Sequence, residues 1–351
     1  MDDKVGLDPS SWAPWTHRPY CAETPYCAFT NSMFRGNNGV SIITTSEIAA
    51  SSPELLAKLT TPIVETASVE FPYTVRDIPG KGKGLFAARR IARGEVFLED
   101  YPSVLADVEF PGRVRRDQGQ LLLQRAIEQL GQAEEVLSLA RSSTAGAPVQ
   151  EDVMRTNTFG ITLGERSRMA LFPKISRINH ACSPNAFTRF AESTIVNKVI
   201  AFRDIEPGEE ITISYLEVGL PSQERQRALH NRWGFQCTCE LCSASAGEIA
   251  ASDRRRERIR AVRQEVLEHV QRRDFNSAIK ANEELVDLIV KEKMAPHLGE
   301  HYEVLARLYL AATDLKSAKK YAQLALVDLE ANGGSTVYDS VEELRQLLEW
   351  R

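Results

Sequence analysis

The sequence predicts an α+β protein in which small β-sheets are interrupted by a helical insert and followed by an all-helical C-terminal lobe. Short apolar runs separated by glycine-bearing turns begin near residue 71, as in compact β structure. Apolar residues recur at helical intervals between about 117 and 141, and beyond about 250 strand signals almost disappear. A chain of 351 residues, 43% of them hydrophobic, is long enough for two or three packed units.

Residues 1–70 carry scattered aromatic side chains, many Ser and Thr, and no sustained hydrophobic period. We therefore expect an irregular N-terminal extension. Cys21 and Cys27 lie in it without a partner motif, and we expect them to be half-buried free thiols and not metal ligands.

Residues 71–220 are expected to form the β unit, with a helical insert over about 112–172. Turns are predicted at Ala92-Arg-Gly-Glu and Glu206-Pro-Gly-Glu. The insert is predicted from apolar residues at helical spacing, which are Leu123, Ile127, Leu130, Leu137 and Ala140. The predicted strands are Gly84-Leu-Phe-Ala-Ala, Glu95-Val-Phe-Leu, Phe159-Gly-Ile-Thr-Leu, Val199-Ile-Ala-Phe and Glu210-Ile-Thr-Ile-Ser-Tyr.

Residues 251–351 are predicted to be helical and similar to tetratricopeptide helix pairs. Two stretches echo each other, Asp274-Phe-Asn-Ser-Ala-Ile and Asp314-Leu-Lys-Ser-Ala-Lys, at a spacing of about 40 residues instead of about 34. Two degenerate repeats cannot bury a continuous core alone, so we expect this lobe to lean on the β unit. The basic run that starts at Asp253 is interpreted as a solvated helix face.

The charge balance limits the classes of partner. A net charge of -5 and a pI near 5.8 argue against a protein that grips nucleic-acid phosphates, and a basic tail of a partner protein is a better match. The N-terminus lacks the pattern of a signal peptide, and no apolar run approaches the roughly 20 residues of a membrane span. We expect an intracellular protein, nuclear or cytoplasmic, and a monomer without direct nucleic-acid or membrane partners.

Three thiols within six residues, Cys237, Cys239 and Cys242, suit tetrahedral zinc coordination with bonds of about 2.3 Å. The fourth ligand would come from His180 or Cys182 in Ile178-Asn-His-Ala-Cys-Ser-Pro-Asn, and we choose Cys182. A four-cysteine site would tie together two distant segments and add folding free energy. The alternatives are three unmetallated thiols, or a Cys182–His180 nucleophile and base, for which no orienting acid is evident.

The segment Lys81-Gly82-Lys83-Gly84-Leu85 is the second candidate for a binding site. Glycine lets the backbone approach a ligand closely, and the two lysines can meet a carboxylate. The segment lacks the strand–loop–helix setting of a phosphate-binding loop.

In chain order, Gly82-Lys-Gly-Leu, Arg177-Ile-Asn-His-Ala-Cys-Ser-Pro-Asn, Gly208-Glu-Glu-Ile-Thr-Ile-Ser-Tyr and Cys237-x-Cys-x-x-Cys resemble the motif series of a SET domain with a post-SET zinc knuckle. The helical insert, Thr156-Asn-Thr-Phe-Gly-Ile and the helical lobe are similar to the SMYD subgroup. The resemblance covers about residues 71–245, with the knuckle in 221–250. No cysteine lies between Cys27 and Cys182, so the MYND zinc finger of that subgroup is missing.

The resemblance implies a protein-lysine N-methyltransferase that uses S-adenosyl-L-methionine and one structural zinc ion, on a fold of small curved sheets. Lys81, Lys83 and Asn157 would hold the methionine part of the cofactor, and Asn179, His180 and Phe235 would surround its adenosine. Tyr215 would stand at the methyl group as the catalytic residue. The zinc ligands would be Cys182, Cys237, Cys239 and Cys242.

The mechanism implied by the family is an in-line transfer to a neutral lysine of a histone or non-histone protein. A narrow apolar channel beside a sulfonium would lower the pKa of that lysine by desolvation and like-charge repulsion. The main alternative is a catalytically silent SET-like interaction module that keeps zinc and binds partners through its helices. A further alternative, a nucleic-acid-binding protein held together by zinc, conflicts with the net negative charge of the chain.

Overall fold

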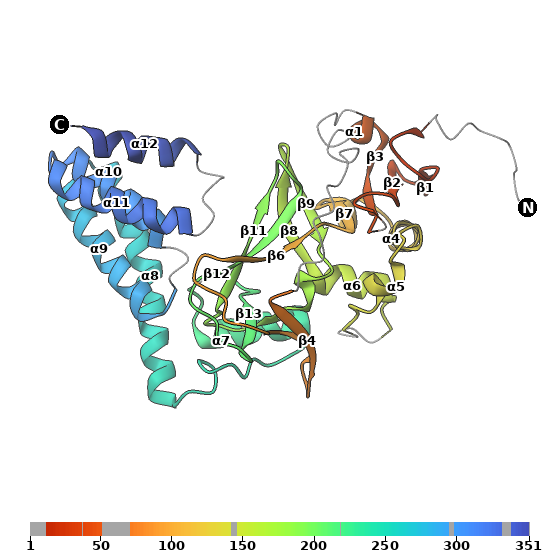
Figure 1. Ribbon diagram of the computed structural model, residues 1–351, viewed down its shortest axis with the longest axis horizontal. Helices are drawn as coiled ribbons and strands as arrows, with labels where there is room; N and C mark the ends of the chain where they lie inside the picture. The colour runs from red at the N-terminus through yellow and green to blue at the C-terminus, as the bar shows by residue number, and fades with distance from the viewer. Residues whose placement is uncertain are drawn as a thin grey trace, which may run out of the picture. The chain divides into compact units, whose positions relative to one another are not determined.

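Strands and helices alternate up to residue 213 of the described chain, and helices alone follow (Figure 1). The computed structural model describes residues 12–36, 38–50, 71–141, 146–217, 219–294, 298–331 and 338–350. Two compact units share the chain. Unit 1 comprises Met1–Glu70, Glu99–Arg177 and Phe190–Lys198, and unit 2 comprises Phe71–Leu98, Ile178–Arg189 and Val199–Arg351. The boundaries predicted at residues 70, 220 and 250 stay predictions.

Unit 1 contains a six-stranded sheet of order β1-β2-β3-β7-β9-β8. Its β3–β7 pair is parallel, and the other pairs are antiparallel. Every residue of β2 and nearly every residue of β3 is buried, so both faces at the centre of this sheet are covered. The strands are β1 (Tyr20–Cys21), β2 (Tyr26–Asn31), β3 (Val40–Thr45), β7 (Val104–Asp107), β8 (Thr158–Leu163) and β9 (Arg166–Leu171).

The prediction of an irregular extension over residues 1–70 is wrong for residues 20–50, which form β1, β2, β3 and helix α1 (Ser46–Ala50). Residues 1–11, 37 and 51–70 lie outside the described part of the chain. The strands escaped prediction because each is six residues or shorter, and β2 and β3 mix polar residues with their apolar ones. The two thiols predicted to be free are joined as a Cys21–Cys27 disulfide, since β1–β2 pairing places them directly opposite each other.

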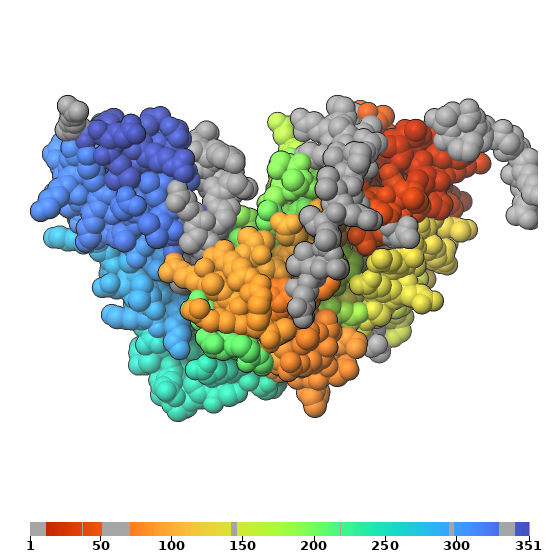
Figure 2. Space-filling view, viewed as in Figure 1, coloured from red at the N-terminus to blue at the C-terminus, as the bar shows by residue number. Residues whose placement is uncertain are grey.

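The predicted helical insert forms four helices that lie against this sheet. Leu122, Leu123, Ala126 and Ile127 on α4 belong to one buried core together with residues of β2 and β3. Figure 2 shows the yellow insert packed beside the red N-terminal strands. The helices are α3 (Phe110–Arg113), α4 (Arg116–Glu128), α5 (Ala133–Leu137) and α6 (Val149–Asn157). The insert was predicted to reach residue 172, but its last part is the β8–β9 hairpin.

Asp100, the last residue of β6 (Val96–Asp100), holds the turn before the 3-10 helix η2 (Ile175–Arg177). Its Oδ2 accepts hydrogen bonds from the backbone N–H groups of Lys174 (2.7 Å) and Ile175 (3.1 Å). Its Oδ1 accepts one from Tyr101 (3.0 Å). Burial raises the pKa of this carboxyl to about 6, although the three N–H donors act to lower it.

Unit 2 contains a four-stranded sheet of order β10-β13-β5-β4. β10 runs parallel to β13, whereas the β13–β5 and β5–β4 pairs are antiparallel. A three-stranded sheet, β11-β12-β6, is built from strands in which the chain passes from one unit to the other. The bounds are β4 (Tyr73–Ile78), β5 (Gly82–Ala87), β10 (Asn179–His180), β11 (Ala186–Ala191), β12 (Val196–Ala201) and β13 (Glu210–Ile213).

The elements of unit 2 that follow β13 in the described residues are helices, as predicted for the tail, and α8 to α12 each pack against the next (Figure 1). No helix in the described residues is long and apolar enough to cross a bilayer. The tail will be called the helical tail. Its helices are α8 (Ala246–Gln271), α9 (Phe275–Lys291), α10 (Leu298–Ala311), α11 (Leu315–Ala331) and α12 (Tyr338–Glu349), and α7 (Ser222–Trp233) precedes it.

The two echoing stretches form the same helix-to-helix corner. The residue before each aspartate has positive φ, 57° at Arg273 and 64° at Thr313. Asp274 Oδ1 then accepts the backbone N–H of Ser277 (3.2 Å), and Asp314 Oδ1 accepts that of Ser317 (3.0 Å). Each aspartate therefore caps the helix that follows, which accounts for the repeat in the sequence.

Asp100 should make stability depend on pH. Its folded pKa of about 6 lies above the ordinary 3.8, so its contribution is complete below pH 3.8 and is lost as the pH rises through about 6. Other carboxyls titrate too, so the test compares urea unfolding of the wild type with Asp100→Asn. The stability difference between them should grow by about 2 kcal/mol from about pH 7.5 to about pH 4.5. A difference independent of pH would contradict this assignment.

Candidate active site

Unit 2 brings the Lys81–Leu85 segment against the Asn179-His180 pair. Asn179 Nδ2 donates to the backbone oxygen of Lys83 (3.2 Å) and to Glu210 Oε1 (2.9 Å). A Cβ at Gly84 would stand 2.8 Å from Asn179 Nδ2 and 2.6 Å from Ile78 Cδ1. A side chain at position 84 would therefore have to displace Ile78 and Asn179.

The two lysines of the segment face carboxylates of the protein. Lys81 Nζ lies 3.7 Å from Glu210 Oε2, and Lys83 Nζ lies 3.4 Å from Asp77 Oδ1. Both lysine side chains are more than 40% exposed, so these loose ion pairs contribute little stability. Both ammonium groups can therefore turn to another anion at little cost.

His180 is buried, and its hydrogen bonds define its tautomer. Nδ1 accepts the backbone N–H of Tyr215 (3.0 Å), so the ring proton of the neutral form belongs on Nε2. Nε2 lies 3.3 Å from Cys182 Sγ. Burial is the main cause that lowers the pKa of His180 to about 4, so the ring is neutral at neutral pH.

Tyr215 follows β13 within an aromatic cluster. Its hydroxyl donates to the backbone oxygen of Ile178 (2.6 Å). Its ring centroid lies 5.4 Å from that of His180 and 5.2 Å from that of Trp233. The ring centroids of Phe235 and His180 are 6.4 Å apart. The site therefore offers half-buried aromatic faces beside a neutral imidazole.

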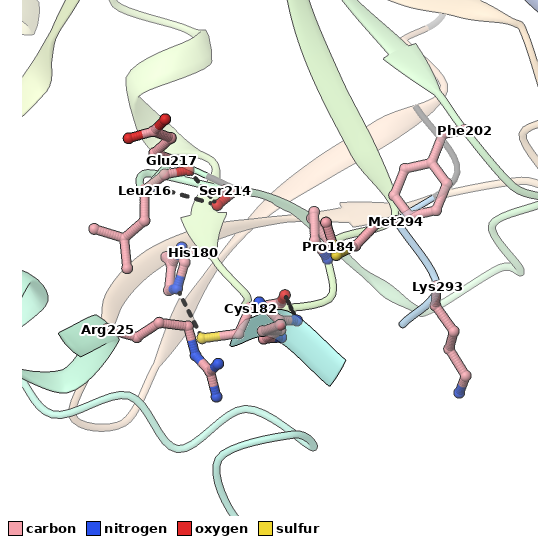
Figure 3. Close-up of a pocket in the computed structure, with 11 residues that line it drawn as sticks. His180, Cys182, Pro184, Phe202, Ser214, Leu216, Glu217, Arg225, Lys293 and Met294 are labelled. Atoms are coloured by element: carbon pink, nitrogen blue, oxygen red, sulfur yellow. Dashed lines mark hydrogen bonds between the residues drawn. The ribbon is translucent and has the colours of Figure 1, made fainter. Parts of the chain in front are cut away.

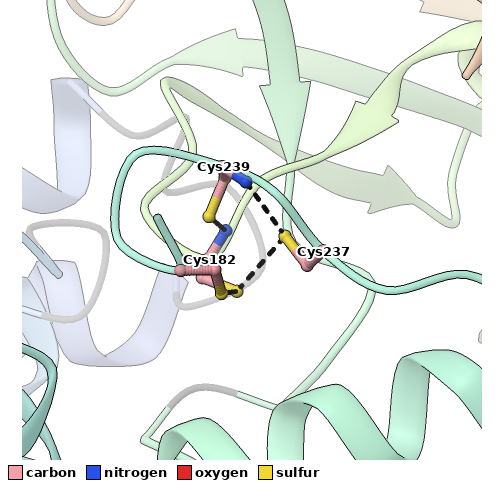
Figure 4. A group of neighbouring side chains, drawn as sticks. Cys182, Cys237 and Cys239 are labelled. Atoms are coloured by element: carbon pink, nitrogen blue, oxygen red, sulfur yellow. Dashed lines mark hydrogen bonds between the residues drawn. The ribbon is translucent and has the colours of Figure 1, made fainter. Parts of the chain in front are cut away.

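Four thiols converge next to this cluster (Figure 4). The Sγ atoms of Cys182, Cys237, Cys239 and Cys242 all lie within 4.8 Å of one another, and none forms a disulfide. Cys182 Sγ is 3.9 Å from Cys237 Sγ and 3.5 Å from Cys242 Sγ. A tetrahedron with metal–sulfur bonds of about 2.3 Å has sulfur–sulfur edges of about 3.8 Å. The cluster could therefore hold a metal ion.

Charges around the thiols fit a negative metal–thiolate group. Arg225 on α7 is 2% exposed, and its Nε and Nη2 have no hydrogen-bond partner. Burial acts to lower the pKa of this guanidinium, but negative charge on Cys182 and Cys242 raises it more, so the net pKa is raised. Hydrogen bonds from neighbouring thiols lower the pKa of Cys239 and of Cys242, whereas the pKa of Cys182 and that of Cys237 are raised. A bound cation would therefore be needed to hold all four cysteines as thiolates, which are the metal-binding form.

A small pocket of about 40 Å³ adjoins the thiols and is lined entirely by unit 2 (Figure 3). His180 and Cys182 form part of its wall. Arg225, Arg256 and Lys293 bring positive charge to it, while Glu217 brings negative charge. Pro184, Phe202, Ser214, Leu216 and Met294 complete the lining.

Residues 82–216 match the family model of the SET domain. The chain therefore contains a SET domain over this stretch. This match contains three of the four motifs, and the cysteine run lies just beyond its end. The predicted family and the α+β SET fold are confirmed.

Curated relatives carry names of lysine methyltransferases. The chain is 30% identical over 197 residues to "Histone-lysine N-methyltransferase set5" of Schizosaccharomyces pombe, covering 53% of this chain and 56% of that protein. It is 38% identical over 88 residues to human "Histone-lysine N-methyltransferase SMYD3", covering 24% and 20%. It is 42% identical over 85 residues to mouse "Protein-lysine N-trimethyltransferase SMYD5", covering 22% and 20%. The matched stretches thus span about half or less of these relatives.

The SET-domain residues predicted from the motifs divide between the two units. Lys81, Lys83, Asn179, His180, Tyr215, Phe235 and the four cysteines belong to unit 2. Asn157 belongs to unit 1, where its Nδ2 donates to the backbone oxygens of Leu139 (3.1 Å) and Val153 (3.0 Å). Its proposed contact with the cofactor stays a prediction.

Sequence reasoning missed four residues of this site. Glu210 joins Asn179 to Lys81, and Trp233 packs on Tyr215. Arg225 and Arg256 line the pocket beside the thiols. Trp233 and Arg225 could have been proposed from the sequence, because they lie shortly before Cys237 in the chain. Arg256 had none, because it belongs to a run of arginines that a solvated helix face also explains.

Gly84→Ala should destabilise the protein by about 1–3 kcal/mol, because the new methyl group would collide with Asn179 and Ile78. Urea unfolding would measure the loss. The matched control is Gly160→Ala, at an exposed strand position with nothing within 4 Å, which should change stability by less than about 0.5 kcal/mol. Equal stability of the two variants would show that the close approach at Gly84 is unimportant.

Proposed function

We propose that this chain is an S-adenosyl-L-methionine-dependent protein-lysine N-methyltransferase with one structural zinc ion. The observation that carries the proposal is a pair of contacts within the stretch that matches the SET domain. Asn179 bonds the Lys81–Leu85 segment, and His180 bonds the backbone of Tyr215. The names of the relatives support lysine as the target. The substrate class is a lysine-bearing protein, histone or non-histone.

The residues of unit 2 fit the cofactor. The exposed ammonium groups of Lys81 and Lys83 suit its carboxylate. The half-buried faces of Phe235 and Tyr215, next to neutral His180, suit its purine and its sulfonium. In this assignment Asn179 and His180 line the adenosine together with Phe235.

S-adenosyl-L-methionine supplies a methyl group bound to a positively charged sulfur. The aromatic cluster of Tyr215, Trp233 and Phe235 would exclude water around the arriving lysine and favour its neutral form. The Tyr215 hydroxyl is already oriented by the backbone oxygen of Ile178, so it presents a fixed dipole to the amine. The lysine needs no strong base from the protein, because its neutral amine is the attacking form.

The four cysteines would hold the zinc ion in a structural role. Such a site has no open position, so it contributes to folding and not to the chemistry. Cys182 lies two residues after His180, and Cys237 lies two residues after Phe235. Zinc would therefore fix both residues that are assigned to the adenosine.

The proposed cofactor site predicts that Asn179→Ala weakens S-adenosyl-L-methionine binding by at least about tenfold in calorimetric titration of zinc-loaded protein. Asn179 holds the Lys81–Leu85 segment in place through hydrogen bonds to Lys83 and Glu210, and alanine removes both bonds. Asn276→Ala, on the exposed first turn of α9, is the control and should bind like the wild type. No binding by folded wild-type protein would instead favour the silent interaction module.

Tyr215→Phe should lower methyl transfer to a lysine peptide library by at least about a hundredfold while cofactor affinity stays within about twofold. The variant keeps the ring that packs on His180 and Trp233, and it loses only the hydroxyl. Tyr321→Phe makes the same change in the helical tail, where the hydroxyl bonds Glu283, and should leave turnover unchanged. Undiminished transfer by Tyr215→Phe would remove the catalytic role.

The metal assignment predicts one zinc per chain by atomic emission. Cys239→Ser should lose most of this zinc and melt at lower temperature, because a structural site needs all four thiolates. Cys21→Ser changes an exposed cysteine outside the cluster and should keep the full zinc content. Wild-type protein that takes up no zinc would overturn the assignment.

A further inference from the structure

Two buried arginines that the proposed chemistry does not use lie beside the four-cysteine cluster. Arg225 comes from α7 and Arg256 from α8, and each is 2% exposed. Both donate through Nη1 to the same backbone oxygen, that of Leu220, at 2.7 Å and 3.5 Å. Arg256 Nη2 also lies 3.5 Å from the backbone oxygen of Cys182. Both guanidinium groups line the pocket with Cys182, and Figure 3 shows Arg225 beside Cys182 there.

The charge of a metal–thiolate group explains why two guanidinium groups are tolerated here. Four thiolates around one divalent cation leave two negative charges, and burying them needs compensation. Arg225 is the group best placed to supply it, because its Nε and Nη2 are buried and have no other partner. Its nearest carboxylate is that of Asp253, at 3.9 Å.

Arg256 is held in place by the helical tail. Its Nε lies 2.7 Å from Glu292 Oε2, just beyond the end of α9, and both side chains are almost fully buried. Glu292 Oε2 also accepts from Ser252 Oγ (2.7 Å), and Oε1 accepts from Arg255 Nε (2.6 Å). A continuous chain of polar contacts therefore runs from the corner after α9, through Arg256, to the backbone of Cys182.

We propose that Arg225 and Arg256 are positioning residues that neutralise the metal–thiolate group and hold Cys182, and that Glu292 makes retention of the metal depend on the helical tail. The inference rests on the zinc site proposed above. Neighbours of metal ligands commonly change metal affinity by about 10- to 100-fold when removed. Here the neighbours come from helices that lie before and after the cysteine run, so the tail becomes part of the metal site.

The test measures the rate at which zinc-loaded protein releases zinc to a coloured chelator in excess, with circular dichroism recorded on each variant. Arg225→Gln should release zinc at least about tenfold faster than the wild type, and Arg225→Lys should recover most of the retention because it keeps the charge. Arg256→Gln alone would take from the buried Glu292 the ion pair at its Oε2 and leave only the one with Arg255, so the pair is removed as Arg256→Gln/Glu292→Gln. This double variant should also release zinc about tenfold faster.

Arg258→Gln is the matched control, because Arg258 also joins α8 to α9 through an ion pair, with Glu284 at 2.7 Å. Arg258 is absent from the pocket lining, so this variant should retain zinc like the wild type. If both Arg225→Gln and the double variant released zinc at the wild-type rate, the inference would be overturned, but the proposal of a zinc site would stand. Equally fast release from Arg258→Gln would also overturn it, since helix packing alone would then set the rate. Failure of the wild type to bind zinc would overturn both proposals, and the wild-type sample shows it directly.

Discussion

The convergence of four thiols is the constraint on which the candidate site depends. Cys182 and Cys237 are 55 residues apart in the chain, yet their sulfur atoms lie 3.9 Å apart. His180 lies just before one of them and Phe235 just before the other, while α8 begins four residues after Cys242 with a Ser245–Glu248 capping box. A single cluster thus fixes the imidazole, an aromatic wall and the entry to the helical tail.

Two buried carboxylates of the helical tail, Asp328 and Glu292, are each paired with an arginine. Isolated buried ions cost more than their attraction returns, so each must be paired and bonded on all sides. Asp328 shows the pattern in the tail: it pairs with Arg93 (2.7 Å) and accepts the backbone N–H of Gly299 (2.9 Å) at the start of α10. Glu292 likewise pairs with Arg256 (2.7 Å) and accepts from Ser252 Oγ (2.7 Å), so each carboxylate has both an ion pair and a further hydrogen bond.

The features of this protein that could be predicted are encoded by residues close together in the sequence or repeated at a regular spacing. Three cysteines in six residues, the echoing aspartate caps and the strand-and-turn alternation after residue 71 each follow from rules about nearby residues. The N-terminal strands were missed because each is short, and because the pairing of β3 with β7 is a distant contact that no local pattern encodes. Arg256 and Glu292 were missed for the same reason, since nothing in a charged helix distinguishes the one arginine that turns inward.

The imidazole of His180 links the metal cluster to the proposed catalytic tyrosine. A backbone N–H can only donate, so the contact from Tyr215 requires an unprotonated Nδ1 and leaves the proton on Nε2, which faces Cys182 Sγ. A metal-bound thiolate accepts that proton better than a neutral thiol does, so metal binding would strengthen the tautomer that holds Tyr215. The low pKa of about 4 keeps the ring from gaining a second proton, which would compete for the same N–H contact. The two nitrogens of a neutral His180 ring therefore connect Cys182 of the cluster to the backbone of Tyr215.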